Sequence, residues 1–173
     1  KKKKKKGQPP RWSDFELPAP KAGEHTVNIK AAALNHRDVF ITQGLYPGIK
    51  APSIRGADGA GLAGQREVVI NPNVGWGSSI VHQEPGYRVL GMPDHGTMSE
   101  QIILPADRLE DKPAHLSWEE AAALPLGGLT AYRALFTRGG CAAGHKVLIS
   151  GIGGGVALFA LQFALACGAE AYV

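Results

Sequence analysis

The segment from residue 147 to residue 173 constrains the fold more than any other stretch of the chain. It reads VLISGIGGGVALFALQFALACGAEAYV, in which a short apolar run, a glycine cluster, a long apolar run and a second short apolar run follow one another. These lengths predict a strand over 146–150, a helix that ends near Cys167 and a strand from Glu170 to Val173. This order is typical of the start of a βαβ unit with parallel strands.

The turn between this strand and this helix has a composition that suits a bound diphosphate. It contains Gly151, Gly153, Gly154, Gly155 and Val156. Glycines allow a sharp bend and let a diphosphate approach the main-chain amides, and the positive end of the following helix favours the same anion. The spacing departs from G-x-G-x-x-G, because the last position falls on Val156, or on Ala157 in the alternative register. We interpret the turn as a dinucleotide cradle; a plain glycine-rich turn of an α/β protein is the alternative.

Composition excludes several classes of protein. Hydrophobic residues make up 44% of the chain and charged residues 20%, as in water-soluble globular proteins. The longest apolar segment, Val156–Cys167, is too short to cross a bilayer, and the N-terminus lacks the apolar region of a signal peptide. Two cysteines, Cys141 and Cys167, do not make a disulfide framework. We therefore expect a cytoplasmic protein with reduced thiols and no membrane association.

The formal net charge of +4 depends on the lysine run Lys1–Lys6. Without these six lysines, 13 basic and 15 acidic residues remain, which gives a net charge of −2. A lysine run can bind nucleic acid or anionic lipid, but it is more often an unstructured tail. Because the rest of the chain is not basic, nucleic acid is not expected as a partner.

The first 105 residues favour short strands over helices. Strands are expected over 27–33, 67–70, 87–92 and 99–104, with turn residues between them. A short helix is expected over 35–43, with Asn35 as its N-cap and Asp38 in its first turn. Residues 55–64 contain four glycines and predict tight turns. This pattern indicates a small, irregular β-barrel or sandwich.

The pattern changes near Ser117. The sequence Ser117-Trp118-Glu119-Glu120 is a capping box for a helix that ends before Pro125. Gly127-Gly128 is expected to separate this helix from a second helix over 129–137. We place a domain boundary near residue 120.

Five stretches, in the expected order, resemble the medium-chain dehydrogenase/reductase superfamily. They are AAALNHRDVFITQG, IRGADGAG, PDHGTMSEQIILPADRL, LSWEEAAALPLGGLTAYRALF and VLISGIGGGVALFALQFALACGA. The most similar branch contains quinone oxidoreductases, enoyl reductase domains and zinc-type alcohol dehydrogenase-like proteins, and the tetrapeptide 35–38, NHRD, points to the last of these. The resemblance implies an α/β and β fold class. A GroES-like, alcohol dehydrogenase N-terminal-like catalytic β-barrel over residues 1–120 would be followed by the start of a Rossmann NAD(P)-binding domain over 121–173.

The same resemblance implies an NAD(P)H-dependent oxidoreductase. Its cofactor would be NADP, less often NAD, and hydride would pass to a small-molecule quinone, enone or other carbonyl compound. Alcohol dehydrogenases of the superfamily carry a cysteine ligand within the stretch that here reads ALNHRD, and Gly-His-Glu where this chain has Gly56-Ala57-Asp58. Because the thiolate and the imidazole are both missing, no zinc is expected.

Site residues carried over by position are Asn35, His36 and Asp38 near the nicotinamide and substrate, and Thr130 at the nicotinamide end of the cofactor. Asn35 would hydrogen-bond a carboxamide or carbonyl, or else only cap a helix. His36 would donate a proton after hydride addition, or else be a plain surface histidine. Thr130 could equally be an ordinary helix residue, and Asp58 is expected to hold the barrel loop.

The chain also departs from the family pattern. The hairpin near residues 62–66 is shorter than in the family, and the chain stops within the second Rossmann strand, before the residue that separates NAD from NADP. We therefore expect a truncated chain that binds NADPH weakly or not at all, whose full-length form could pair as a homodimer. The alternative function is that of a non-catalytic homologue that acts as a binding or scaffold protein.

Overall fold

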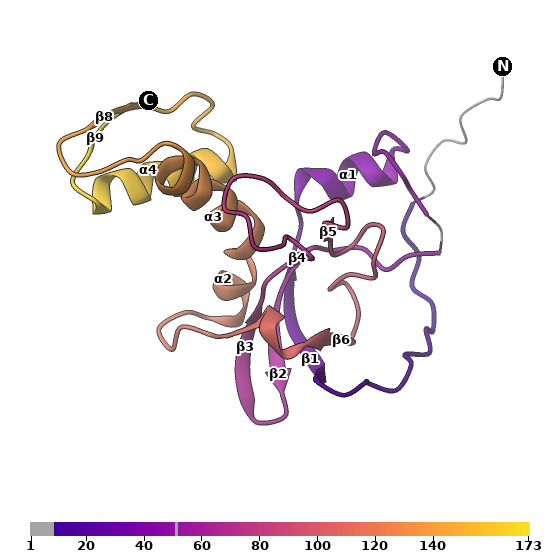
Figure 1. Ribbon diagram of the computed structural model, residues 1–173. Coiled ribbons are helices and arrows are strands. Elements are labelled where there is room, and N and C mark those ends of the chain that lie inside the picture. Colours follow the sequence, from indigo (N-terminus) through magenta and orange to yellow (C-terminus); the bar gives the residue numbers. More distant parts are fainter. Residues whose placement is uncertain (1–8, 51) are drawn as a thin grey trace, which may run out of the picture.

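The computed structural model describes residues 9–50 and 52–173. The prediction for Lys1–Lys6 lies outside these residues. The chain forms a strand-rich unit, in which α1 (His36–Thr42) lies beside the sheet, and a smaller helical unit that carries the C-terminus (Figure 1). None of the helices in the described part is long and apolar enough to cross a membrane. The expected mixed α/β architecture is confirmed.

The strand-rich unit is built on a five-stranded antiparallel sheet. Its order is β6-β1-β2-β3-β7, and a two-stranded pair, β4 with β5, lies beside it. The strands are β1 (Glu24–Ala33), β2 (Asp58–Ala63), β3 (Arg66–Ile70), β4 (Asn73–Val74), β5 (Arg88–Val89), β6 (Gln101–Pro105) and β7 (Leu109–Asp111). A 3-10 turn, Ala106–Arg108, connects the last two. Alternate residues of the strands point inward, as period-two patterning requires.

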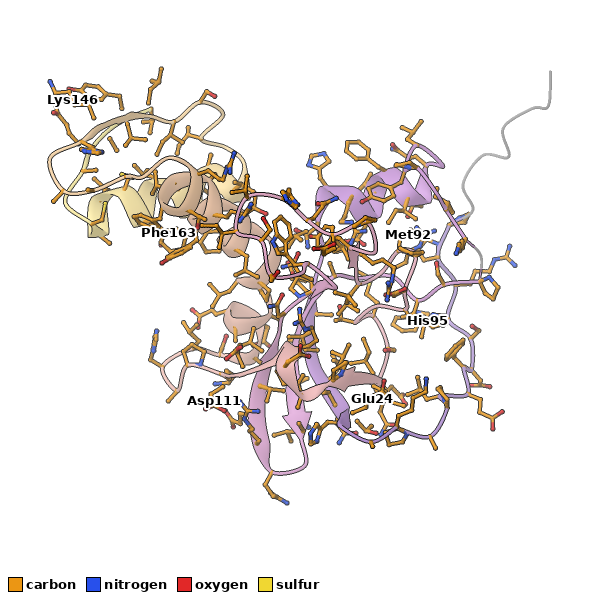
Figure 2. The ribbon with its side chains drawn as sticks, viewed as in Figure 1. Glu24, Met92, His95, Asp111, Lys146 and Phe163 are labelled. Carbon is orange, nitrogen blue, oxygen red and sulfur yellow. The ribbon has the colours of Figure 1, made fainter. Side chains whose placement is uncertain are left out.

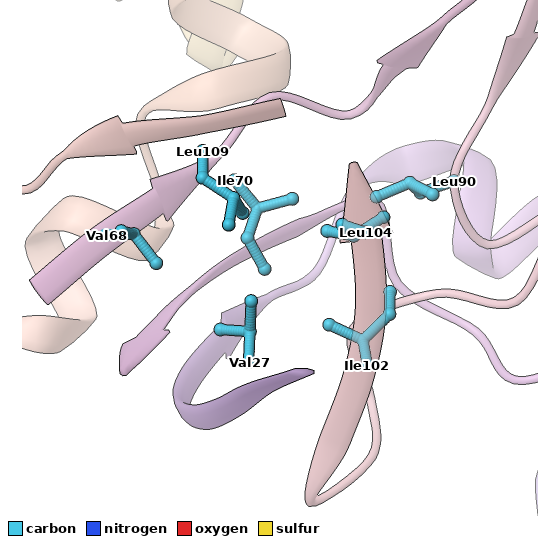
Figure 3. Close-up of a cluster of buried hydrophobic side chains, with 7 residues drawn as sticks. All are labelled: Val27, Val68, Ile70, Leu90, Ile102, Leu104 and Leu109. Atoms are coloured by element: carbon cyan, nitrogen blue, oxygen red, sulfur yellow. The ribbon is translucent and has the colours of Figure 1, made fainter. Parts of the chain in front are cut away.

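One apolar cluster forms the core of this unit. Its members come from β1, β3, β6, β7 and the segment after β5, and all are at least 96% buried (Figure 3). They are Val27, Val68, Ile70, Leu90, Ile102, Leu104 and Leu109. Full burial of such side chains stabilises the sheet by about 1.5–3 kcal/mol each.

The glycine-rich stretch 55–64 was predicted as tight turns, and most of it is strand. Residues 58–63 form β2, a central strand between β1 and β3. A Cβ added to Gly61 would overlap the carbonyl oxygen of Asn28 on β1, next to a break in register at Ile29/Ala31. Here glycine allows two strands to approach closely, and that need cannot be read from turn propensity. A two-residue turn at Gly64-Gln65, with Gly64 at φ +63°, joins β2 to β3.

The C-terminal unit contains the helices that follow the sheet and the parallel strand pair. Its elements are α2 (Trp118–Ala122), α3 (Pro125–Tyr132), a π-helical turn (Arg133–Arg138), β8 (Lys146–Leu148), α4 (Gly155–Ala166) and β9 (Glu170–Tyr172). β8 and β9 pair in parallel, as the sequence predicted. Figure 2 shows Lys146 and Phe163 in this unit, well away from Glu24 and Asp111 of the sheet.

Two further expectations need correction. The strand predicted over 87–92 is only Arg88–Val89, because Gly91 turns the chain at φ +84° against the backbone of Gly56. The helix predicted over 129–137 begins at Pro125 and contains Gly127-Gly128 in its interior. Proline fits the first turn of a helix, and a Cβ at Gly127 would lie 3.1 Å from the Phe159 ring on α4, so this glycine permits close packing.

The two units are joined through α2. Its Ala121 and Ala122 pack against Ala60 on β2, and these small side chains bring the helix close to the sheet. The next helix, α3, packs mainly on α4. The change of packing partner therefore falls between Ala122 and Pro125, and the domain boundary near residue 120 remains a prediction.

Replacing Gly61 by alanine tests whether strand packing requires glycine there. The new methyl group would meet the Asn28 carbonyl, so the free energy of unfolding in urea should fall by about 1–3 kcal/mol. Gly128→Ala is the matched control. No atom lies within 4 Å of an added Cβ at this helical position, so this change should stabilise by about 0.5–1 kcal/mol. Equal effects of the two substitutions would contradict the packing argument.

Candidate functional site

A buried carboxylate, Asp58, connects three parts of the fold. It lies at the start of β2 with 2% of its surface exposed. Its Oδ2 accepts a hydrogen bond from Asn35 Nδ2 at 2.8 Å, and its Oδ1 accepts one from the backbone N–H of Leu126 at 2.9 Å. Asn35 is the N-cap of α1 and Leu126 is in the first turn of α3. Asp58 therefore ties the starts of two helices to the sheet.

Burial controls the protonation of Asp58. Loss of hydration raises the pKa of this carboxyl to about 6, although the hydrogen bonds from Asn35 and Leu126 favour the ionised form. The nearby Asp38 carboxylate raises the pKa further and Arg37 lowers it. At neutral pH the group is mainly ionised, and it becomes mainly protonated below about pH 6.

Asp38, a predicted site residue, is buried and hydrogen-bonded to the backbone. It is 4% exposed, its Oδ2 accepts the backbone N–H of Asn35 at 2.9 Å, and its Oδ1 accepts that of Gly56 at 3.3 Å. The first of these contacts is half of a capping box at the start of α1. Both carboxylate oxygens are occupied by backbone donors, so Asp38 positions Asn35 and Gly56 rather than facing open space.

Arg55 adds a half-buried guanidinium near this carboxylate. Burial lowers the pKa of its guanidinium, and attraction to Asp38 opposes that change. Its Nη1 atom is buried and has no hydrogen-bond partner among the described residues. Sequence reasoning did not single out Arg55, because nothing in the local pattern indicates which side chain of the segment 52–57 turns inward.

Close backbone contact fixes the segment that carries Asp58. Gly56 has φ +91°, and a Cβ there would lie 2.6 Å from Thr97 Oγ1. Thr97 is fully buried, and its hydroxyl donates to the Asp58 carbonyl oxygen at 2.6 Å. The backbone N–H of Thr97 donates to the Gly56 carbonyl at 3.0 Å. The segment around Gly56 and the segment around Thr97 are far apart in the sequence and are held together by these bonds. Glycine at position 56 allows the two backbones to approach this closely.

A line of hydrogen bonds joins two predicted site residues that are far apart in the sequence. Asn35 donates to Asp58, Asp58 accepts from the Leu126 N–H, and the Leu126 carbonyl accepts from Thr130 Oγ1 at 2.7 Å. We call Asn35, Asp38, Asp58, Leu126 and Thr130 the polar cluster. The backbone of Leu126 was missed by sequence analysis; its position directly after Pro125 marks it as an N–H without a partner inside the helix.

His36 lies beside the polar cluster without joining it. It is the first residue of α1, it is exposed, and its ring lies 5.3 Å from that of Phe40. Arg37, which sequence analysis left without a role, turns inward instead. Its Nη1 donates to the Leu90 carbonyl at 2.6 Å and its Nη2 donates to the Met92 carbonyl at 3.2 Å. Arg37 therefore fixes α1 to the loop that contains Met92 (Figure 2).

The predicted glycine cradle lies in the C-terminal unit. Gly151 has φ +71°, the Gly154 N–H donates to the Gly151 carbonyl at 2.9 Å, and α4 begins at Gly155. No atom lies within 4 Å of an added Cβ at Gly151, Gly153 or Gly155, so the turn is open. Val156 is 43% exposed. The first N–H groups of α4 lack partners inside the helix, which suits an anion.

The helix α3 connects the cradle to the polar cluster. A pocket of about 480 Å³ lies between the glycine turn and the segment 131–135. Its lining includes Ala131, Ala134, Leu135, Gly151, Gly154 and Val156. The first turn of α3 contacts Asp58 and its end faces the glycine turn, so this helix spans both groups of predicted site residues.

The polar cluster contains no cysteine and no histidine side chain. Asn35 donates its amide to Asp58, Ala57 has no ligating atom, and both Asp38 oxygens accept backbone N–H groups. Across the residues that the structure describes, no three His, Cys, Asp or Glu side chains gather as metal ligands would. Zinc sites in proteins use thiolate, imidazole or free carboxylate.

The pH dependence of stability tests the role of Asp58. Its pKa is raised to about 6 from 3.8, so the folded state binds the proton more tightly than the unfolded state does between these values. Its contribution to stability is therefore full below about pH 4 and is lost as the pH rises through 6. We define a stability difference as the free energy of unfolding of the wild-type protein minus that of Asp58→Asn. This difference should decrease by about 2 kcal/mol between pH 4 and pH 7.5.

Urea unfolding of both proteins at the two pH values gives this difference and cancels the other titrating groups. Asp111→Asn, which changes an exposed carboxylate paired with Arg66, is the control and should show a difference of under about 1 kcal/mol at either pH. A wild-type minus Asp58→Asn difference that is constant with pH would refute the assignment.

Comparison with known proteins identifies the family of the chain. Residues 21–114 match the family model of the alcohol dehydrogenase GroES-like domain. The chain is 36% identical over 196 aligned positions to the zinc-type alcohol dehydrogenase-like protein YogA of Leptosphaeria maculans, an alignment that covers 99% of this chain and 55% of that protein.

Two solved structures also superpose on the chain. A crystal structure of an NAD-dependent alcohol dehydrogenase does so with a TM-score of 0.84 at 38% identity, over 92% of this chain and 52% of that one. The quinone oxidoreductase of Thermus thermophilus, solved also with NADPH, does so with a TM-score of 0.72 at 29% identity, over 92% and 47%. The chain thus spans about half the length of the curated relatives that it matches.

These matches confirm the resemblance and the fold class expected from the sequence, and the Asn35, Asp38 and Asp58 contacts lie within the matched region. The chain therefore belongs to the alcohol dehydrogenase GroES-like domain family of the medium-chain dehydrogenase/reductase superfamily.

Proposed function

We propose that the protein is an NAD(P)H-dependent oxidoreductase that reduces a small quinone, enone or other carbonyl compound without catalytic zinc. The observation that carries this proposal is the open glycine turn at the start of α4, which α3 joins to the polar cluster. A nicotinamide cofactor would supply the hydride, and the chain would supply orientation and electrostatics. The similarity to an NAD-dependent alcohol dehydrogenase and to a quinone oxidoreductase solved with NADPH supports it.

The residues at the turn fit a dinucleotide diphosphate. Gly151, Gly153, Gly154, Gly155 and Val156 would offer main-chain N–H groups, and added Cβ atoms at three of the glycines would meet only open space. The positive end of α4 would favour the anion by about 0.3–1 kcal/mol for each charge near it. Thr130 would contact the nicotinamide end through its methyl group or by accepting a hydrogen bond at its hydroxyl oxygen, since its hydroxyl hydrogen is donated to the Leu126 carbonyl.

The polar cluster would orient the substrate. Asn35 uses one amide hydrogen on Asp58 and keeps its second amide hydrogen and a lone pair of its carbonyl oxygen for a carboxamide or a substrate carbonyl. Asp38 and Asp58 would hold Asn35 in place rather than exchange protons with substrate, because both are almost fully buried. His36, exposed beside them, would donate the proton that completes reduction.

The absence of a zinc ligand set favours carbonyl or quinone reduction over alcohol oxidation. A metal that polarises an alcohol oxygen needs thiolate or imidazole ligands; the stretch ALNHRD contains no cysteine, and Ala57 stands where the family has its histidine. An activated alkene or quinone accepts hydride more readily without such help. NADP is the preferred cofactor in this proposal, with NAD as the alternative.

Binding at the glycine turn is tested by nuclear magnetic resonance of the isotope-labelled chain with NADP⁺ or NAD⁺ at millimolar concentration, where weak binding is still visible. The amide signals of residues 151–156 should shift most. Gly153→Val should abolish these shifts without loss of folding stability, because no atom lies within 4 Å of the new Cβ. Gly128→Ala, with equal free space but in α3, should leave them unchanged. Unchanged shifts in Gly153→Val would contradict the cradle.

Turnover without zinc is tested by following NADPH oxidation with a panel of small quinones and enones, before and after treatment with a metal chelator. The rate should be the same in both conditions, because the polar cluster offers no zinc ligands. A rate that disappears with chelator and returns with added zinc would contradict the proposal.

A further inference from the structure

The two cysteines of the chain lie against each other in the C-terminal unit. Cys141 follows the π-helical turn and Cys167 is the C-cap of α4, and their Sγ atoms are 3.8 Å apart. Both are free and partly buried. They are also the only cysteines of the chain, so neither has another thiol of the same molecule to pair with. Nothing in the proposed redox chemistry of the site uses them.

The surroundings hold these two side chains together. Both pack against the small core of Leu135, Ile149, Ala164 and Ala169. The backbone N–H of Cys141 donates to the Leu135 carbonyl at 3.0 Å. Three residues further along, the Gly144 N–H donates to the Gly168 carbonyl at 2.9 Å. The loop with Cys141 is therefore fastened to the π-helical turn at one end and to the turn after Cys167 at the other.

From this juxtaposition we propose that Cys141 and Cys167 form a reversible disulfide that closes the βα unit of β8 and α4. A disulfide requires the sulfurs to approach by about 1.8 Å more, to about 2.05 Å. Rotation of the two side chains and a small shift of the loop 139–144 supply this movement. The crosslink joins positions 26 residues apart and encloses β8, the glycine turn and α4.

The oxidant in this proposal is a small disulfide such as glutathione disulfide. One cysteine thiolate attacks a sulfur of glutathione disulfide, which forms a protein–glutathione mixed disulfide and releases one glutathione. The second cysteine then attacks the protein sulfur of that mixed disulfide and releases the second glutathione. The two protein thiols lose two electrons and two protons in total, and the glutathione disulfide is reduced to two thiols.

The environment fits a disulfide that exchanges slowly. Partial burial, followed by the neighbouring Cys167 thiol, raises the pKa of Cys141, so little thiolate is present at neutral pH. Cys167 Sγ also donates to the Ala164 carbonyl at 3.2 Å. The bond would form at the C-terminal end of α4 and would leave the amides at Gly151–Gly155, at its N-terminal end, open. The inference does not depend on the proposed oxidoreductase activity.

The test incubates the reduced full chain in mixtures of oxidised and reduced glutathione, blocks the remaining thiols and digests it with trypsin without reduction. Cleavage after Arg138 and Lys146 places the two cysteines in different peptides, 139–146 and 147–173. We expect a monomer in which these peptides are linked and whose mass is about 2 Da below that of the reduced chain. Two glutathione adducts without a linked peptide, or disulfide-linked dimers alone, would overturn the proposal.

Two variants and a melting measurement complete the test. Cys141→Ser and Cys167→Ser should each carry one glutathione and give no linked peptide. The oxidised wild-type protein should melt roughly 5–10 °C above its own reduced form, because the crosslink restricts the unfolded chain. This comparison uses one protein in two redox states, so it does not depend on how the serine variants fold. An oxidised form that melts at or below the reduced form would contradict a stabilising crosslink.

Discussion

The rest of the structure depends on the buried Asp58 carboxylate, which accepts two hydrogen bonds. One bond reaches the side chain at the start of α1 and the other reaches the backbone at the start of α3. Loss of a partner would leave a buried donor or a buried charge unsatisfied, at a cost of about 1–3 kcal/mol or more. The carboxylate therefore fixes two helices that carry predicted site residues relative to one sheet.

Glycine plays two different parts in this fold. At Gly61 and Gly127 it lets neighbouring elements approach closely, a strand in the first case and a phenylalanine ring in the second. At Gly153 and Gly155 an added side chain would meet nothing, so packing does not require glycine there. The proposed cofactor cradle would use this open backbone, and substitution there can test binding without disturbing the packing.

The helix α3 contacts both units. Its first turn is held by Asp58, its interior packs on α4 through Gly127, and its last turn contributes Ala131 to the pocket next to the glycine turn. A change in the protonation of Asp58 would thus act at the start of α3, and the other end of this helix borders the proposed cofactor site. Arg37 and Thr97 complete this arrangement by fixing α1 and the loop before β2.

The sequence by itself determined those features that are local. The period-two pattern of Val27–Ala33, the capping residues at Asn35 and Ser117, and the order strand, glycine turn, helix and strand after residue 146 all predicted elements that the structure contains. These signals depend on near neighbours in the chain. The match of several such stretches, in order, also made the superfamily recognisable before any contact was known.

Only the tertiary structure decided what depends on contacts between distant residues. In the structure, the glycine-rich residues 58–63 form a central strand, and α3 begins at Pro125. Both carboxylate oxygens of Asp38 accept hydrogen bonds from backbone N–H groups. The tertiary structure also joined Asn35 to Thr130 through Asp58 and brought Cys141 beside Cys167. Propensity and spacing carry no information on these contacts, because each depends on which atom of a far segment lies opposite when the core closes.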